Sequence, residues 1–108
     1  MMTFGITANT GKQFVRLLLP DVMQWFSEKG VPYVLDERTA QHLGLRPEGH
    51  RRLNLASLCA ECDMVLTFGG DGTILSTVRE FGARSIPILG VKIGGMGFLA
   101  DLAPAIVD

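Results

Sequence analysis

The sequence feature that most constrains the fold is the stretch Met64 to Thr73, MVLTFGGDGT, where an uncharged apolar run stops at three glycines placed around one aspartate. The run has the length and the β-preferring residues of a strand that is covered on both faces. Apolar residues then recur at helical spacing from 74 to 81, which predicts a helix with Thr73 as its N-cap and Gly82 at its end. A strand, a glycine-rich turn and a helix in this order predict an α/β, doubly wound fold with a mainly parallel sheet.

The glycines Gly69, Gly70 and Gly72 predict an anion site. Each glycine can adopt a positive φ and leaves the backbone bare of side chains. A bare backbone at a helix N-terminus presents unpaired N–H groups and the positive end of the helix dipole, so phosphate or pyrophosphate can lie against it. The alternative is a tight turn between strand and helix whose glycines serve packing alone.

Asp71 is the unexpected member of this turn, because a carboxylate would repel phosphates unless its side chain points to a sugar hydroxyl or a metal ion. A hydroxyl held beside a bound pyrophosphate is what an enzyme that phosphorylates a ribose needs. Asp71 is therefore the predicted catalytic residue, orienting the hydroxyl and accepting its proton. The turn is not the dinucleotide fingerprint G-x-G-x-x-G, because Leu75 stands where the last glycine belongs.

Two motifs resemble those of NAD kinases. The segment GGDGT, residues 69–73, is similar to a signature shared by NAD kinases and by diacylglycerol and sphingosine kinases. The segment ILGVKIGGMGFLAD, residues 88–101, is similar to a second NAD kinase motif, in which many members have asparagine where this chain has Lys92. The Gly-Thr-Gly-Asn-Asp segment of lipid kinases does not occur. The resemblance extends from Phe4 to Asp101.

The resemblance implies a Rossmann-like N-terminal domain and the phosphorylation of the 2′-hydroxyl of the adenosine ribose of NAD to give NADP. ATP or inorganic polyphosphate would be the donor, with a divalent metal ion such as Mg²⁺. No residue is assigned to the metal. Phe98 either offers its ring to the adenine or belongs to the core. The residues expected to bind the nucleotides are Gly69, Gly70, Asp71, Gly72, Thr73, Gly97, Phe98, Leu99 and Asn9.

The first strand, Phe4 to Ala8, runs into Asn9-Thr10-Gly11-Lys12. This loop does not have the spacing of a Walker P-loop. It follows the carboxyl end of a strand, where doubly wound sheets bind ligands, so Asn9 and Lys12 can contact phosphate; a solvated turn is the alternative. Asp36, at the end of the second strand, occupies the position at which Rossmann proteins bind a ribose, although the glycine fingerprint is missing.

The remaining elements are predicted from periodicity and from turn residues. Residues 13–29 form a helix that Pro20 either bends or restarts. A second strand covers 31–35, a helical turn covers 39–43, and 44–53 is an exposed loop. The last residues, 102–108, resemble the opening of a further helix.

Composition excludes several classes of protein. A net charge of −1 over 108 residues gives no broad attraction to nucleic acid or to a membrane surface. The sequence has neither a secretory signal nor an apolar run near the roughly 18 residues that span a bilayer, so we expect a cytoplasmic protein. Cys59 and Cys62 form a C-x-x-C pair, which we interpret as reduced core residues rather than a zinc or redox site.

NAD kinases continue with a β-rich domain that carries an Asn-Glu motif, and they are often homo-oligomers. We therefore expect these residues to be the N-terminal part of such an enzyme and inactive alone. Two alternatives stay open at the level of sequence. One is a lipid kinase that uses the same Asp71 turn, and the other is a non-catalytic nucleotide-binding module.

Overall fold

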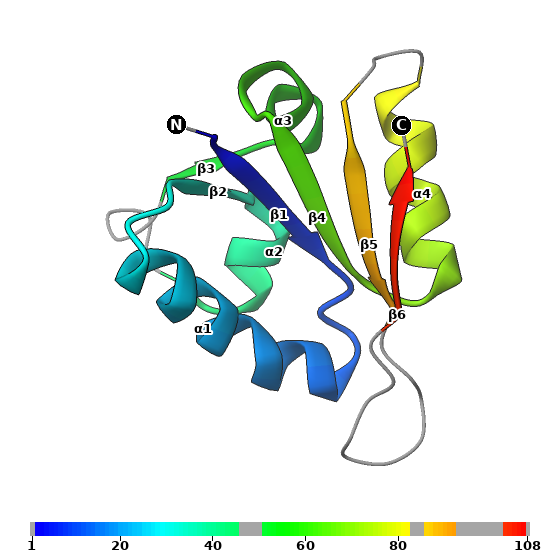
Figure 1. The fold of residues 1–108 in the computed structure, drawn as a ribbon. Coiled ribbons are helices and arrows are strands. Elements are labelled where there is room, and N and C mark those ends of the chain that lie inside the picture. The colour runs from blue at the N-terminus through cyan, green and yellow to red at the C-terminus, as the bar shows by residue number, and fades with distance from the viewer. Residues whose placement is uncertain (1, 46–50, 83–85, 93–102, 108) are drawn as a thin grey trace.

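The computed structural model describes residues 2–45, 51–82, 86–92 and 103–107. The chain forms one six-stranded sheet in the order β3-β2-β1-β4-β5-β6, with helices on both faces (Figure 1). Neighbouring strands are parallel except for β5 and β6, which pair antiparallel. The prediction of a doubly wound, mainly parallel α/β sheet is confirmed. The strands are β1 (Phe4–Ala8), β2 (Tyr33–Asp36), β3 (Arg52–Leu53), β4 (Met64–Gly69), β5 (Ile88–Lys92) and β6 (Ala103–Val107), and the helices are α1 (Gln13–Glu28), α2 (Glu37–His42), α3 (Leu55–Glu61) and α4 (Asp71–Phe81).

The strand order reverses between β1 and β4. From β1 the chain continues to β2 on one side, and from β4 it continues to β5 on the other. Ala8 pairs with Phe68 across the β1–β4 ladder, and the N–H of Asn9 donates to the carbonyl of Phe68 at 2.9 Å. The carboxyl ends of β1 and β4 therefore lie side by side at the switch point, where open α/β sheets bind ligands.

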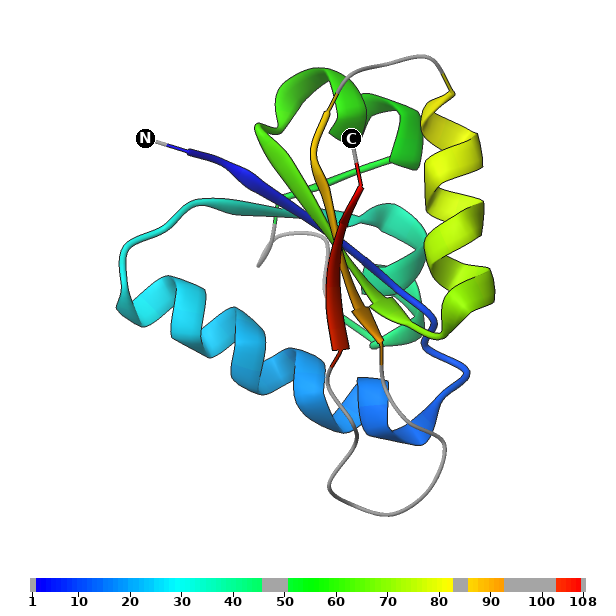
Figure 2. The ribbon, with the colours of Figure 1, turned by 45° about the vertical axis from the view of Figure 1, so that its right-hand side comes forward.

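Two apolar cores hold the helices to the sheet. On one face α1 contributes Val15, Leu19, Met23 and Phe26 to a core that also contains Ala40 of α2. On the other face the second core is built from α3 and α4 against β4 and β5. Figure 2 shows α1 and α4 on opposite sides of the sheet. Because each face has its own core, both helices are fixed relative to the strands that carry the turns.

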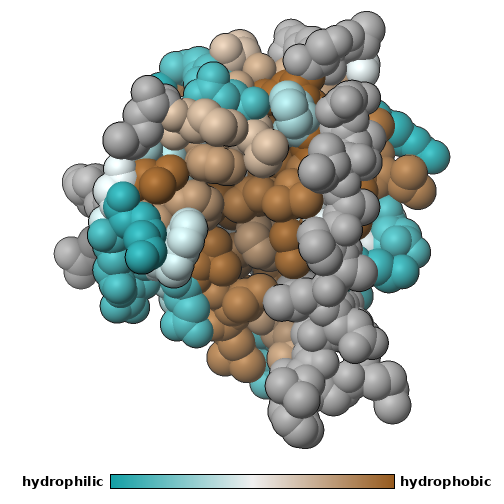
Figure 3. Space-filling view, viewed as in Figure 1, coloured by the Kyte–Doolittle hydropathy of each residue, from teal (hydrophilic) through white to brown (hydrophobic). Residues whose placement is uncertain are grey.

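The α1 face of the sheet is apolar beyond the helix itself. Met64 of β4 and Leu89 and Val91 of β5 are partly buried and pack against the α1 core. Figure 3 shows this apolar area at the centre of the face.

Helix α1 is unbroken from Gln13 to Glu28 with Pro20 inside it, so of the two predicted alternatives, a bend or a restart at Pro20, the restart does not occur. Proline removes one helical hydrogen bond. Pro20 is exposed, which leaves the freed carbonyl group near water, while the buried residues on the other side anchor both halves of the helix. Packing of the buried side therefore outweighs the local cost of the proline.

The predicted C-terminal helix over 102–108 is wrong. Ala103–Val107 form strand β6, in which Ile106 pairs with Leu89 of β5. Without β6 the N–H and C=O groups along β5 would form an open sheet edge, and pairing satisfies them. Pro104 is compatible with a strand at the edge of a sheet.

Two other predicted segments differ from the structure. The second strand begins at Tyr33, later than predicted, and the segment expected to be a loop contains the short strand β3. Cys59 and Cys62 are free and buried, as expected for core residues, and burial raises the pKa of the Cys62 thiol. No helix within the described ranges has the length and hydropathy to cross a membrane.

Candidate functional site

The glycine turn between β4 and α4 is shorter than predicted. Helix α4 begins at Asp71 with Gly70 as its N-cap, so the expectation that Thr73 caps the helix is wrong. Of the three glycines, only Gly69 has a positive φ, at 154°. A Cβ on Gly69 would lie 2.7 Å from Oγ1 of Thr73, so any other residue at this end of the strand would be strained.

Gly72 helps to distinguish the two interpretations of the turn, an anion site or a tight turn whose glycines serve packing alone. A Cβ built on Gly72 meets nothing within 4 Å, so close packing against the described residues does not require this glycine. At Gly70 the nearest atom to such a Cβ is Nζ of Lys12, at 3.5 Å. The backbone of the first α4 turn is therefore open on its outer side. This openness fits an anion site better than a turn made of glycines for packing alone.

The first turn of α4 has amide groups free to bind. Its N-cap makes no side-chain hydrogen bond, and the first N–H groups of an α-helix have no acceptor within the helix. The helix dipole adds partial positive charge at the same point. The turn is nevertheless rigid, because Oγ1 of Thr77 donates to the carbonyl of Thr73 and shares a hydrogen bond with Oγ1 of Thr67 in β4, both at 3.0 Å.

Asp71 projects into solvent and not into the core. Its side chain is 74% exposed, and its Oδ2 lies 3.2 Å from Nζ of Lys92. The parallel register of β4 and β5, in which Gly69 pairs with Lys92, brings the two side chains together. The carboxylate is thus available to a ligand at the bare end of α4, beside a cation that sequence reasoning did not connect with it.

The first loop approaches the turn from the β1 side. Lys12, the N-cap residue of α1, places its ammonium group next to Gly70. Asn9 uses its Oδ1 to accept a hydrogen bond from the N–H of Gly11 at 3.0 Å, so its side chain mainly shapes the loop. A hollow of about 520 Å³ lies between loop and turn and is lined by Asn9, Lys12, Gly70, Asp71, Gly72, Thr73 and Ser76.

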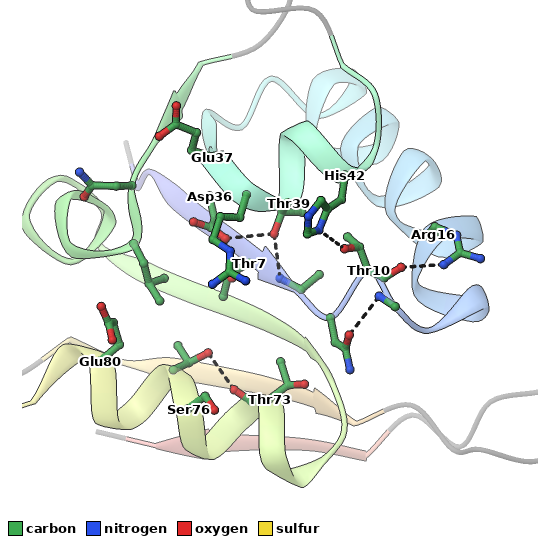
Figure 4. A pocket seen from close by; sticks show the side chains of 17 residues that line it. Thr7, Thr10, Arg16, Asp36, Glu37, Thr39, His42, Thr73, Ser76 and Glu80 are labelled. Atoms are coloured by element: carbon green, nitrogen blue, oxygen red, sulfur yellow. Dashed lines mark hydrogen bonds between the residues drawn. The ribbon is translucent and has the colours of Figure 1, made fainter.

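A second cavity of about 800 Å³ continues from this hollow toward β2. Asn9, Thr73 and Ser76 line both spaces. Figure 4 shows α2 residues, among them Thr39 and His42, on one side and Thr73, Ser76 and Glu80 of α4 facing them. The two spaces therefore adjoin across the switch point, with the bare end of α4 beside the smaller one, and together they are called the groove.

Asp36 lies in the second cavity with only 7% of its surface exposed. Its Oδ2 accepts hydrogen bonds from Oγ1 of Thr7 and Oγ1 of Thr39, each at 3.2 Å. Oγ1 of Thr39 also accepts the N–H of Ala8 at 3.2 Å. The structure thus brings Asp36 into the same groove as Asp71, and it adds Thr39, whose contribution depends on the packing of α2 against β1.

Other side chains fix the first loop. Oγ1 of Thr10 lies 2.7 Å from Nδ1 of His42, and Nη1 of Arg16 donates to the carbonyl of Thr10 at 2.7 Å (Figure 4). Arg79 lies in the last turn of α4, about 12 Å along the helix axis from Asp71. Arg51 pairs with Glu61 at 2.7 Å on the surface. Neither of these two arginines belongs to the groove.

Three predicted binding residues, Gly97, Phe98 and Leu99, lie outside the described residues. Lys92, at the end of β5, is the last described residue before them in the chain.

The donor set at the turn fits a divalent ion such as Mg²⁺. This ion usually takes one or two carboxylates together with waters and substrate phosphates. Asp71 offers one exposed carboxylate beside the bare amides. Within the described part of the chain no group of three or more His, Cys, Asp or Glu residues gathers to hold a metal. Most ligands of such an ion would therefore come from the substrate.

Comparison with known proteins gives consistent results. The family model of the ATP-NAD kinase N-terminal domain matches residues 4–108. The NAD kinase of Desulforamulus reducens is 33% identical over 102 residues, which are 94% of this chain and 34% of that protein. The NAD kinase of Sulfurimonas denitrificans is 38% identical over 78 residues, or 72% of this chain and 26% of that protein. The chain thus spans about a third of the length of the curated relatives it matches.

Among solved structures, the crystal structure of yeast NADH kinase complexed with NADH superposes with a TM-score of 0.71 and 22% identity, covering 94% of this chain and 34% of that one. At this identity the likeness concerns the fold. Since the family match runs over nearly the whole sequence, the chain belongs to the NAD kinase family, as its ATP-NAD kinase N-terminal domain.

Proposed function

We propose that this chain supplies the phosphate-binding turn and the catalytic carboxylate of an enzyme that phosphorylates the 2′-hydroxyl of the adenosine ribose of NAD to give NADP, with ATP or inorganic polyphosphate as donor. The observation that carries the proposal is the exposed Asp71 carboxylate at the bare N-terminus of α4. The membership of the chain in the NAD kinase family supports the choice of NAD as acceptor. The activity is that of a protein as long as its relatives, about three times the length of this chain.

Asp71 holds the attacking hydroxyl and takes its proton as the bond to phosphorus forms. In phosphoryl transfer, positioning and charge neutralisation provide most of the rate, so a carboxylate of ordinary basicity is sufficient. The amides of Gly70, Asp71 and Gly72 bind phosphate oxygens, and Lys12 and Lys92 add positive charge on either side. A divalent ion held by Asp71 and the phosphates would neutralise charge on the transferred group.

The ion pair between Lys92 and Asp71 fits this role. Lys92 holds the carboxylate at the mouth of the groove until substrates arrive. A phosphate that binds at the turn then competes for the ammonium group, and the carboxylate becomes available to the ribose hydroxyl. The dinucleotide would lie on the β5 side, where the resemblance places Gly97, Phe98 and Leu99, while Asn9 borders the site from the β1 side.

The direct test replaces Asp71 with asparagine in the full-length protein that carries these residues. We expect kcat for NAD phosphorylation to fall by about 10²- to 10⁴-fold, with little change in NAD binding measured by titration calorimetry. Asp63→Asn is the matched control, because Asp63 accepts the N–H of Thr3 at the other end of β4 and is exposed. Unchanged turnover in Asp71→Asn would instead indicate a non-catalytic nucleotide-binding module.

The same preparation tests the acceptor. Phosphate transfer to diacylglycerol or sphingosine in preference to NAD would identify a lipid kinase and refute the proposal. We also expect residues 1–108 alone to show no turnover. A homo-oligomer in light-scattering measurements, and a cytoplasmic location in cell fractionation, complete the proposed description.

A further inference from the structure

The two ends of the groove differ in charge. At the α4 end, two lysines flank bare amides. At the β2 end, the cavity of about 800 Å³ is lined by the acidic residues Asp36, Glu37 and Glu80 and by Arg16 and Arg38. The first end suits a chain of phosphates. The second end, with a carboxylate at its floor, suits a neutral group that carries hydrogen-bond donors.

Asp36 is the residue that needs an explanation. A buried carboxylate is costly unless its charge is compensated. Within the described parts of the chain the ion pairs are Arg51–Glu61 and Lys92–Asp71, so Asp36 has no cationic partner there. Its compensation comes from the two threonine hydroxyls, and both of them donate to Oδ2. Oδ1 accepts no hydrogen bond from the described residues, and Asp36 lines the cavity. This oxygen is therefore available to a donor group of a ligand.

The geometry of phosphoryl transfer determines which substrate reaches this cavity. The attacking and leaving oxygens lie roughly in line on opposite sides of the transferred phosphorus. Strand order places β5 on one side of β4 and places β1 and β2 on the other. If the acceptor approaches Asp71 from the β5 side, the donor must extend from the α4 N-terminus toward β1 and β2, and so into the cavity that contains Asp36.

We propose that this cavity binds the nucleoside of a nucleoside triphosphate donor, and that Asp36 accepts hydrogen bonds from the 2′- and 3′-hydroxyls of its ribose while the triphosphate lies between Lys12 and Lys92. The inference rests on the proposed function. The volume is within the usual range for small-molecule sites. Inorganic polyphosphate has no sugar and cannot use Asp36, so only a nucleotide donor makes this contact.

The test compares donors in the full-length protein. In Asp36→Asn we expect the KM for ATP to rise about tenfold, since a hydrogen bond to a charged group contributes about 1.5–3 kcal/mol, while the KM values for NAD and for inorganic polyphosphate stay unchanged. The asparagine Oδ1 can still accept from Thr7 and Thr39, so the fold should be kept. Asp63→Asn removes a carboxylate far from the groove and should leave all KM values unchanged.

A change in the substrate tests the same contact from the side of the ligand. The wild-type protein should use ATP about tenfold better than 2′,3′-dideoxy-ATP in kcat/KM, and Asp36→Asn should lose this preference. Equal use of the two nucleotides by the wild type, or an equal rise in KM for ATP and polyphosphate in the variant, overturns the inference.

Binding without turnover separates the inference from the proposed function. If the protein does not phosphorylate NAD, calorimetric titration with a non-hydrolysable ATP analogue and with tripolyphosphate still reports on the cavity. Weaker binding of the analogue, but not of tripolyphosphate, in Asp36→Asn supports the nucleoside site. Equal binding of the analogue by variant and wild type refutes it.

Discussion

Two turns meet at the switch point of the sheet, and they are built in opposite ways. The loop between β1 and α1 uses its polar groups internally: Asn9 bonds to Gly11, and Thr10 bonds to His42 and Arg16. The turn between β4 and α4 has no side-chain cap and leaves its first amides open. We call the first the closed loop, because its polar groups bond to one another, and the second the open turn, because its amides are free to bind a ligand.

The closed loop supports the site, and the open turn provides the groups that bind the ligand. The open turn is held from behind by the hydroxyls of Thr67 and Thr77, which leave its outer side free. Lys12, at the end of the closed loop, reaches across to Gly70. The closed loop thus positions one charge for the open one. Substitutions in the two turns should therefore have different effects on stability and on binding.

The largest difference is expected between two glycines of the open turn. Gly69→Ala places a Cβ 2.7 Å from Thr73 at a positive φ, and should lower the free energy of unfolding by about 2–4 kcal/mol. Gly72→Ala adds a methyl group to open space inside a helix, and should raise it by about 0.5–1 kcal/mol. Urea denaturation of both variants measures the contrast.

Removing the clashing atom provides a control. Gly69→Ala combined with Thr73→Ala should recover only part of the lost stability, because Oγ1 of Thr73, at 2.7 Å, is then absent while the Cβ at 2.9 Å remains. A Gly69→Ala protein as stable as the wild type would show that the turn is not constrained as described.

Next in size is the effect of the two lysines. Lys12→Gln and Lys92→Asn should each raise the KM for the phosphate donor about three- to tenfold, since both charges are partly solvated. The effect should be the same for ATP and for polyphosphate, unlike that of Asp36→Asn, and should shrink as salt is added. Lys29→Gln, at the C-terminal end of α1, is the matched control. A KM change confined to ATP would place the lysines near the nucleoside instead of the phosphates.

The sequence predicted the open turn well, because its signals are local. The apolar run before Gly69 and the periodic residues after Thr73 define strand and helix without any tertiary information. The start of α4 was missed by three residues, since the residues of its first turn are glycine, aspartate and threonine and carry no apolar periodicity. Asp71 was predicted to orient a ligand hydroxyl, and its exposed side chain is accessible to a ligand.

Features that depend on pairing between distant segments were not predictable. The contact between Asp71 and Lys92 follows from the register of β4 against β5, and the environment of Asp36 follows from the packing of α2 on β1. The short apolar segment 103–107 is compatible with a helix or a strand, and it forms a strand because it pairs with the otherwise open edge of β5. In each case the contacting residues are distant in the sequence, so the residues around one of them do not predict the other.

A smaller effect is expected in the closed loop. Thr10→Val removes the hydrogen bond to Nδ1 of His42 and should lower the free energy of unfolding by about 1 kcal/mol. His42 is exposed and can bond to water, which limits the loss. The donor KM should change less than in the lysine variants. A KM increase as large as that of Lys12→Gln would mean that Thr10 itself contacts the phosphate donor and that the polar groups of this loop do not only support it.

The smallest effect separates the core from both turns. Burial raises the pKa of Cys62, so the thiol keeps its proton in the folded chain at a pH where the unfolded chain loses it. The unfolded state then binds fewer protons, and stability should fall as pH rises above the ordinary thiol pKa of about 8.5. In Cys62→Ala this pH-dependent loss of stability should disappear, as measured by urea denaturation between pH 7 and about 10. The loss should be much smaller than the loss of stability expected for Gly69→Ala. Cys62 lies at the other end of β4 from the groove, so its substitution should leave the affinity for the phosphate donor at neutral pH unchanged. A changed donor affinity in Cys62→Ala would show that this part of the core and the binding site are coupled.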